Sequence, residues 1–264
     1  MADKKRIDVY LYENGMAESR EKARALIIAG EVSIDGRVCS KASTTVTSEQ
    51  DVTVKLNDAF VSRGGKKLQK AIDSFKLDLR GVTAIDVGAS TGGFTDCMLR
   101  SGAVYVYAVD VGYGQLAWRL RQDSRVCVME RQNARYLEPE MFDRPVGFAS
   151  IDVSFISLKL IIPALLKILT PPFTIAALIK PQFEAGRDNV GKKGVVRDKN
   201  VHADVIRGVL NFAEETGLVI CGLDYSPIRG PEGNIEYLAC FRDSGDKTTP
   251  DIMRVVDAAH EGAD

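Results

Sequence analysis

Short apolar runs alternate with stretches of helical spacing from residue 83 to the end of the chain. Helical spacing recurs between most of the runs, for example over Phe94–Ser101, Leu158–Leu169 and His202–Thr216. This alternation predicts an α/β fold, in which a mostly parallel sheet carries helices on both faces. We expect the strands at Thr83–Val87, Val104–Val109, Val126–Met129, Val146–Ile151, Thr174–Ile179, Leu218–Leu223 and Ile235–Phe241.

The first 58 residues follow a different pattern. Apolar residues at helical spacing predict one helix that ends at "NG" (Asn14 and Gly15) and a second that is capped by Ser19 and closes at Ala29 and Gly30. The segment "EVSIDGRVCS" then alternates as a strand does and reverses through Asp35 and Gly36. We therefore expect a small α+β domain over residues 1–58, a linker over 59–64 and a larger α/β domain over 65–264.

The composition, 45% hydrophobic and 27% charged, is typical of a soluble globular protein. The five cysteines form no C-x-x-C pair, which favours a reduced, cytoplasmic setting and predicts no metal site. No apolar segment follows the basic N-terminus as in a secretory signal. The most apolar stretch, 156–169, is interrupted by Lys159, Pro163 and Lys167, so we expect no transmembrane segment.

The formal net charge of −1 conceals two basic stretches. Residues 59–70 contain no acid, and in residues 186–199 the basic residues outnumber Asp188 and Asp198. Both stretches are candidate sites for nucleic-acid phosphates, although a solvated charged face has the same composition. Their cations are Arg63, Lys66, Lys67, Lys70, Arg187, Lys192, Lys193, Arg197 and Lys199.

A glycine-rich turn follows the first expected strand of the larger domain. Gly88, Gly92 and Gly93 give the pattern G-x-x-x-G-G, with Ser90 where a dinucleotide site has its second glycine, which argues against NAD. Asp110 follows Gly88 by 22 residues (110 − 88), near the offset of an acid that binds ribose hydroxyls. Together with Asp86 before the turn, it suits S-adenosylmethionine (SAM), which carries an amino-acid head and a ribose diol.

Charged residues interrupt or end three of the apolar runs. Asp152 follows "GFASI", Lys180 follows "TIAALI" and Glu236 lies in "NIEYLACF". A charged residue at the end of a strand either faces the ligand crevice of the predicted sheet or has no role beyond ending the strand. Lys67, at the start of a predicted helix, is a fourth candidate. A partly desolvated lysine loses its proton more readily than a free one and then serves as a general base. Only two histidines occur and no G-x-S-x-G motif, so other bases are scarce.

The N-terminal pattern resembles the RNA-binding domain named after ribosomal protein S4. It runs R-I-D-x-x-L, G, S-R-x-x-A and I-x-x-G-x-V-x-I-D-G from Arg6 to Gly36. The resemblance implies RNA contacts by Arg6, Arg20, Lys22 and Arg24. Because residues 1–58 carry nine cations against ten acids, only a one-sided arrangement of the cations would form an RNA face.

The whole chain resembles the TlyA family, historically called haemolysins, through "SRGGKKL", "DVGASTGGFTD", "VDVGYGQLAWRLR", "IDVSFISL", "KPQFE", "GVVRD" and "GNIEY". The resemblance implies a SAM-dependent rRNA (cytidine-2′-O)-methyltransferase with a seven-stranded, Rossmann-like domain of the FtsJ type. Its catalytic tetrad falls on Lys67, Asp152, Lys180 and Glu236, with Lys180 as base, and its partner is ribosomal RNA or a ribosomal subunit. The implied SAM pocket contains Gly88, Ser90, Gly92, Phe94, Asp110 and Asn133, and Arg63 and Lys66 join the RNA-binding set.

The chain departs from this family between its two domains, where Asp58-Ala59-Phe60-Val61 stands in place of R-x-W-V. The nucleotide, the ribosomal subunit and the oligomeric state therefore stay open.

The sequence is also compatible in part with two functions of other classes. A membrane-active lysin requires a strongly amphipathic or spanning segment, which the sequence lacks. A SAM-sensing RNA-binding module would keep the glycine turn but has no use for two lysines and two carboxylates at strand ends.

Overall fold

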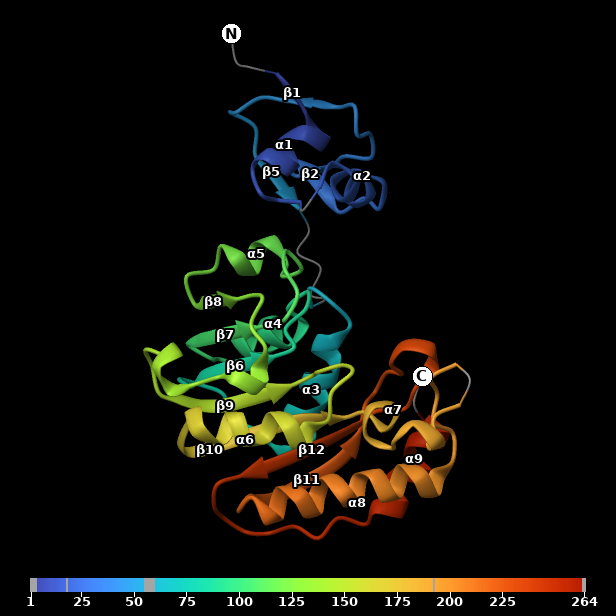
Figure 1. Cartoon of the computed structure of the whole chain (residues 1–264). Helices are drawn as coiled ribbons and strands as arrows, with labels where there is room; N and C mark the ends of the chain where they lie inside the picture. The colour runs from blue at the N-terminus through green and yellow to red at the C-terminus, as the bar shows by residue number, and fades with distance from the viewer. Residues whose placement is uncertain (1–3, 18, 55–59, 192, 263–264) are drawn as a thin grey trace. The chain divides into compact units, whose positions relative to one another are not determined.

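A computed structural model describes residues 4–17, 19–54, 60–191 and 193–262 and divides into two compact units (Figure 1). The first unit comprises Met1–Ala59 with Ala117–Gln122, and the second comprises Phe60–Leu116 with Asp123–Asp264. The domain boundary expected after residue 58 and the linker residue Ala59 lie outside the described residues.

The first unit packs two helices beside short antiparallel strands. Ser19 Oγ accepts a hydrogen bond from Lys22 N at 3.1 Å, which confirms the predicted cap of the second helix. Asp35 and Gly36, with φ of 51° and 76°, form the predicted reversal. The elements are β1 (Lys5–Arg6), α1 (Ile7–Glu13), α2 (Arg20–Ile28), β2 (Val32–Ile34), β3 (Arg37–Val38), β4 (Thr45–Val46) and β5 (Val52–Val54). Strand β1 pairs with β4, and the other three strands form a sheet in the order β3-β2-β5.

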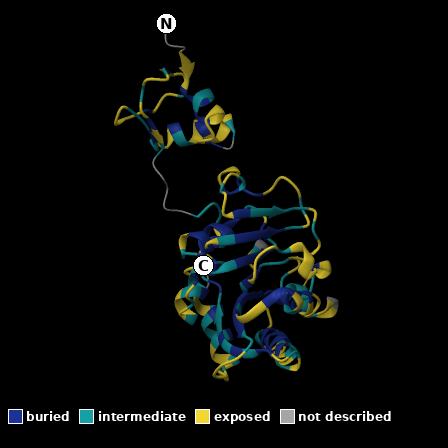
Figure 2. Ribbon diagram, turned by 90° about the vertical axis from the view of Figure 1, so that its left-hand side faces the viewer, coloured by how far each residue is buried: buried dark blue, intermediate teal, exposed yellow. Residues whose placement is uncertain are grey.

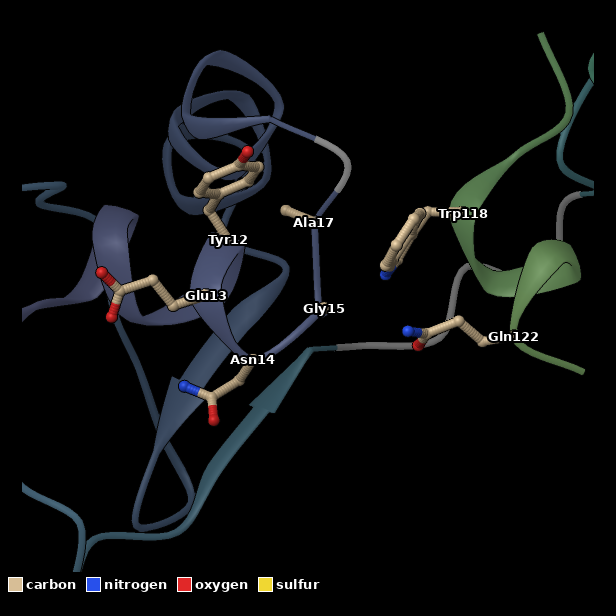
Figure 3. Close-up of a pocket in the computed structure, with 7 residues that line it drawn as sticks. All are labelled: Tyr12, Glu13, Asn14, Gly15, Ala17, Trp118 and Gln122. Atoms are coloured by element: carbon tan, nitrogen blue, oxygen red, sulfur yellow. The ribbon is translucent and has the colours of Figure 1, made fainter. Parts of the chain in front are cut away.

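Figure 3 draws side chains at the end of α1, where Tyr12, Glu13 and Asn14 lie, and the ring of Trp118 on α5 (Trp118–Arg121). The residues that hold α1 and α2 together are fully buried and apolar, among them Ile7, Leu11 and Ile27. The small core thus depends on the apolar positions that predicted the helices.

The second unit is built on a seven-stranded sheet in the order β11-β12-β10-β9-β6-β7-β8. Strand β12 runs antiparallel to both of its neighbours, and β10, β9, β6, β7 and β8 are parallel. The strands are β6 (Thr83–Val87), β7 (Tyr105–Val109), β8 (Val126–Met129), β9 (Val146–Ile151), β10 (Leu169–Ile179), β11 (Val219–Tyr225) and β12 (Tyr237–Arg242). The predicted mostly parallel α/β sheet is confirmed.

Helices cover both faces of this sheet, and Figure 2 shows its strands largely buried. On one face α3 (Gly64–Phe75) packs against α4 (Gly93–Arg100). On the other, α6 (Leu158–Ile168), α8 (Lys199–Glu215) and α9 (Ile252–Gly262) enclose the larger apolar core. Short helices complete the unit: α7 (Pro181–Glu184), η1 (Ala134–Tyr136), η2 (Pro139–Met141), η3 (Arg187–Asn189) and η4 (Pro231–Gly233).

Among the described residues, no helix has both the length and the apolar character needed to cross a membrane. The same residues contain no group of three or more His, Cys, Asp or Glu side chains placed to hold a metal ion. The five cysteines are all free thiols.

Candidate active site

Four charged side chains form two ion pairs in the second unit. Lys67 Nζ lies 2.6 Å from Glu236 Oε2, and Lys180 Nζ lies 2.5 Å from Asp152 Oδ1. Only 9% of the Lys67 side chain and 8% of the Lys180 side chain are exposed, against 0% for Glu236 and 19% for Asp152. Lysine is seldom buried to this extent unless it is paired, because desolvating its charge is costly. The sequence-predicted tetrad thus assembles as two matched pairs.

The sheet topology accounts for this assembly. Asp152 follows β9 and Lys180 follows β10, and because these strands are parallel neighbours, both residues leave the sheet at the same edge. Glu236 instead precedes β12, which is antiparallel to β10 and pairs Tyr237 with Ile179. The amino end of β12 therefore lies at the edge where the parallel strands end, and Lys67 approaches from the first turn of α3.

One buried carboxylate oxygen of the site, Glu236 Oε1, lacks a hydrogen-bond donor among the described residues, whereas Asp152 Oδ1 contacts the Lys180 ammonium. A Cβ at Gly230 would lie 2.3 Å from Glu236 Oε1, so only glycine lets the backbone pass this oxygen. Because unsatisfied buried acceptors are costly, the site favours a ligand that brings donors. The Lys180 amine also donates to Ser154 Oγ at 3.3 Å.

The glycine turn adjoins the Lys180–Asp152 pair. A Cβ at Gly88, where φ is +86°, would lie 2.3 Å from the carbonyl oxygen of Asp152, so the turn and the strand end pack backbone against backbone. Asp152 N also donates to Val87 O at 2.9 Å. Any molecule held by the turn would thus lie beside the ion pair.

Asp110 organises the ligand side of the turn. Its two carboxylate oxygens accept hydrogen bonds from Ser90 N at 2.8 Å and Gly112 N at 2.7 Å. A carboxylate has about four acceptor positions, so these contacts fix its orientation and leave capacity for two hydroxyls. Asn133 is exposed, and its Oδ1 caps η1 by accepting from Arg135 N at 3.1 Å.

Gly92, with φ of +95°, is the residue before α4 and has no side chain to cap the helix, so the first N–H groups of α4 adjoin the glycine turn. Phe94 is 4% exposed, and its ring faces Gly64 of α3. Asp86, the last of the predicted cofactor residues, is 0% exposed and accepts from Thr95 N, Thr95 Oγ1 and Ser150 Oγ. Burial raises the pKa of Asp86 to about 6, against the opposing effect of these hydrogen bonds. Asp86 therefore braces the turn from inside the fold.

Phe155 lies beside the tetrad and was not singled out from the sequence. It is 89% exposed, has φ of 63°, and its ring centroid is 4.9 Å from that of Phe183. A bulky residue with positive φ is strained, and strain of this kind gathers at functional sites. The available signal was a phenylalanine in the polar segment "DVSFIS" directly after Asp152.

The predicted RNA-binding residues fall into two sets. Arg6, Arg20 and Arg24 converge on the buried Asp8 in the first unit, and Lys22 is exposed on α2. Arg63 and Lys66 are exposed at the start of α3, close in sequence to Lys67.

Comparison with family models gives two matches along the chain. Residues 60–243 match the FtsJ-like methyltransferase model, and residues 5–52 match the S4 domain model. The first match contains all four residues of the ion pairs, and the second contains Asp8 and its three arginines.

The chain is also similar to named proteins over nearly its whole length. It is 50% identical over 98% of its residues and 95% of the relative to a Bacillus subtilis protein with the provisional name rRNA methyltransferase YqxC. It is 44% identical over 94% of its residues and 93% of the relative to the 16S/23S rRNA (cytidine-2′-O)-methyltransferase TlyA of Mycobacterium tuberculosis. A solved structure from Streptococcus thermophilus, provisionally named a hemolysin, gives a TM-score of 0.74 at 47% identity and covers 99% of this chain and 97% of that one.

Proposed function

The chain belongs to the FtsJ-like methyltransferases, and on that premise we propose that it transfers a methyl group from SAM to a ribose 2′-hydroxyl of ribosomal RNA. The observation that carries the proposal is the buried Lys180–Asp152 pair beside the glycine turn. The names of the relatives support rRNA as the acceptor and cytidine as the nucleotide. The S4 domain match supports an RNA substrate independently.

The residues around the glycine turn suit the groups that SAM presents. Asp110 would bind the ribose hydroxyls with acceptor positions that its backbone contacts leave available. The start of α4 after Gly92 would receive the carboxylate of the amino-acid head. Ser90, Phe94 and Asn133 complete the proposed pocket. When bound, SAM supplies a methyl group that is already activated on a sulfonium sulfur.

Lys180 is the proposed base. Lys180 first releases one ammonium proton to water, which leaves a neutral amine. As the 2′-oxygen forms its bond to the methyl carbon and the bond from that carbon to sulfur breaks, the hydroxyl proton passes to this neutral Lys180 Nζ. Asp152 and Ser154 hold the Lys180 side chain in one direction, and Lys67 with Glu236 supports the nucleotide and the oxygen that loses its proton. Much of the rate would come from this orientation.

Phe155 is the proposed platform for the acceptor base. Proteins that act on single-stranded RNA commonly stack unpaired bases on exposed aromatic rings. The Phe155 ring is almost fully exposed, is supported by Phe183 and comes three residues after Asp152 in the chain. Stacking there would bring the ribose of the same nucleotide to the ion pair.

The decisive experiment measures transfer of a radiolabelled methyl group from SAM to unmodified small subunits, large subunits and naked rRNA. We expect incorporation at a ribose 2′-oxygen in at least one of them. Absence of label from all three would refute the proposed activity. The two other functions have no comparable support. A non-catalytic SAM-sensing module would not need two buried ion pairs. A membrane-active lysin would have to release dye from liposomes.

A further inference from the structure

Asp8 is an acidic residue buried in the centre of an RNA-binding domain, and the proposed reaction does not use it. It lies in the first turn of α1 and is 0% exposed. Burying a carboxylate is unfavourable unless cations or donors surround it. Asp8 has three such partners, and all of them are arginines.

Two of the arginines reach Asp8 from α2, and the third, Arg6, lies in β1 directly before α1. Arg6 binds through two nitrogens, with Nε 3.0 Å from Oδ1 and Nη2 3.2 Å from Oδ2. Arg24 Nε and Arg20 Nη2, which lie one turn apart on α2, donate to Oδ2 at 3.0 Å and 3.3 Å. Despite the opposing effect of burial, the hydrogen bonds from Arg6, Arg24 and Arg20 hold the pKa of Asp8 far below its usual range. Asp8 therefore stays ionised.

The contacts with Asp8 leave about half of each arginine side chain exposed to solvent. Their side chains are 47%, 49% and 49% exposed for Arg6, Arg20 and Arg24, whereas that of Asp8 is 0% exposed. Three guanidinium charges around one carboxylate leave an excess of two positive charges, and all the exposed groups are positive. The cluster is therefore locally cationic, although residues 1–58 carry nine cations against ten acids overall.

We propose that Asp8 is a positioning residue that gathers Arg6, Arg20 and Arg24 into a preformed clamp for backbone phosphates of RNA. The inference rests on the proposed RNA substrate and adds a role for a negative charge in binding a polyanion. Without Asp8, the three guanidinium groups repel one another and spread. RNA would then have to order three flexible side chains at binding, a cost that the buried carboxylate removes in advance.

The test is Asp8→Asn, which keeps the shape of the side chain and removes its charge. Simple charge counting predicts tighter RNA binding by this variant. We expect the reverse, an affinity about tenfold weaker and a salt dependence of log Kd shallower by about one unit of slope, because fewer phosphates are held. The matched control is Asp51→Asn, which removes an exposed acid of the same unit and should bind RNA as tightly as the wild type or more tightly.

Binding is measured on the full-length chain with radiolabelled transcripts of small- and large-subunit rRNA, at salt from about 50 to about 200 mM. Circular dichroism reports folding, and methyl transfer measured over a range of RNA concentrations should give a raised KM with an unchanged kcat. If Asp8→Asn does not fold, Asp8→Glu is used instead, since it keeps the charge and moves it by one methylene, and we expect an intermediate loss.

A folded Asp8 variant that binds with the affinity and salt slope of Asp51→Asn would overturn the inference. This failure is distinct from failure of the proposed function. If the wild type binds the transcripts but incorporates no methyl group, the activity is refuted and the clamp is still tested by binding.

Discussion

The two units bury aspartates equally well and use them in opposite ways. Asp8 and Asp86 are both 0% exposed, but Asp8 holds three arginines whereas Asp86 accepts hydrogen bonds from Thr95 and Ser150. The pKa of Asp8 accordingly lies below its usual range and that of Asp86 is raised to about 6. The charge of a carboxylate with no exposed surface therefore depends on what covers it, which is half-exposed arginines at Asp8 and neutral groups of the protein interior at Asp86.

The same contrast separates the arginine cluster from the tetrad. Around Asp8 the positive charges are in excess and half exposed, which suits binding to an external polyanion. In the tetrad, two lysines match two carboxylates away from water, which suits the movement of one proton. The first region should therefore govern affinity for RNA and the second should govern turnover.

The largest effect is expected from Lys180→Ala. Loss of the proposed base should lower the single-turnover rate of methyl transfer about 10³-fold, because general-base catalysis contributes on this scale. Binding of SAM, measured by calorimetry, should persist. Lys167→Ala is the matched control, since that lysine forms an exposed pair with Glu138 at 2.8 Å. A loss below about tenfold would mean that Lys180 is not the base.

The second pair is tested through stability. Glu236→Gln leaves the buried Lys67 ammonium without its counter-charge and should lower the free energy of unfolding by about 3 kcal/mol. The double variant Lys67→Met with Glu236→Gln removes both charges, so it should recover most of this loss in urea unfolding. Methyl transfer should not recover, because the proposed support of the nucleotide by Lys67 is gone. If Glu236→Gln alone is as stable as the wild type, the pair is not electrostatically matched.

The two aspartates should give opposite dependences of stability on pH. Asp86 has a folded-state pKa above its unfolded value, so its contribution is present below pH 4 and lost as pH rises to about 6, a cost of roughly 3 kcal/mol. Asp8 has a lowered pKa, so its contribution is present above about pH 4 and lost below it. In urea unfolding, Asp86→Asn should therefore lose less stability than the wild type as pH rises from about 4 to about 6, whatever its stability at pH 4. Parallel profiles of the two proteins would contradict this assignment.

Much of the fold could be predicted because the apolar runs are bounded by polar residues. The predicted bounds of β6, β8 and β9 coincide with the observed Thr83–Val87, Val126–Met129 and Val146–Ile151. Strand β10 begins earlier than expected, at Leu169, because Leu169 pairs with Val146 before a register shift that spans the two prolines. Proline hides such an extension, since it disfavours a strand in any local pattern.

The positions of the proposed catalytic residues could be predicted less completely. Asp152 and Lys180 could be located from strand ends alone, but Glu236 was expected inside a strand and lies one residue before β12. Its position depends on the antiparallel direction of β12, which no local pattern encodes. Asp8 and Phe155 were missed for a similar reason, because the arginines on α2 and the exposure of the ring appear only after folding.

The smallest effect is a difference in how salt acts on the two regions. Raising salt from about 50 to about 200 mM should increase KM for rRNA at least about 20-fold, because three exposed arginines would each lose part of a phosphate contact to screening. The kcat should change less than about twofold, since buried pairs are screened little. Arg24→Gln should flatten the salt dependence of KM by about one unit of slope, whereas Arg37→Gln, at an exposed position outside the cluster, should flatten it less. Steady-state kinetics at several salt concentrations give KM and kcat separately. A kcat that falls in parallel with the affinity for rRNA would mean that the exposed arginines and the buried ion pairs do not act independently.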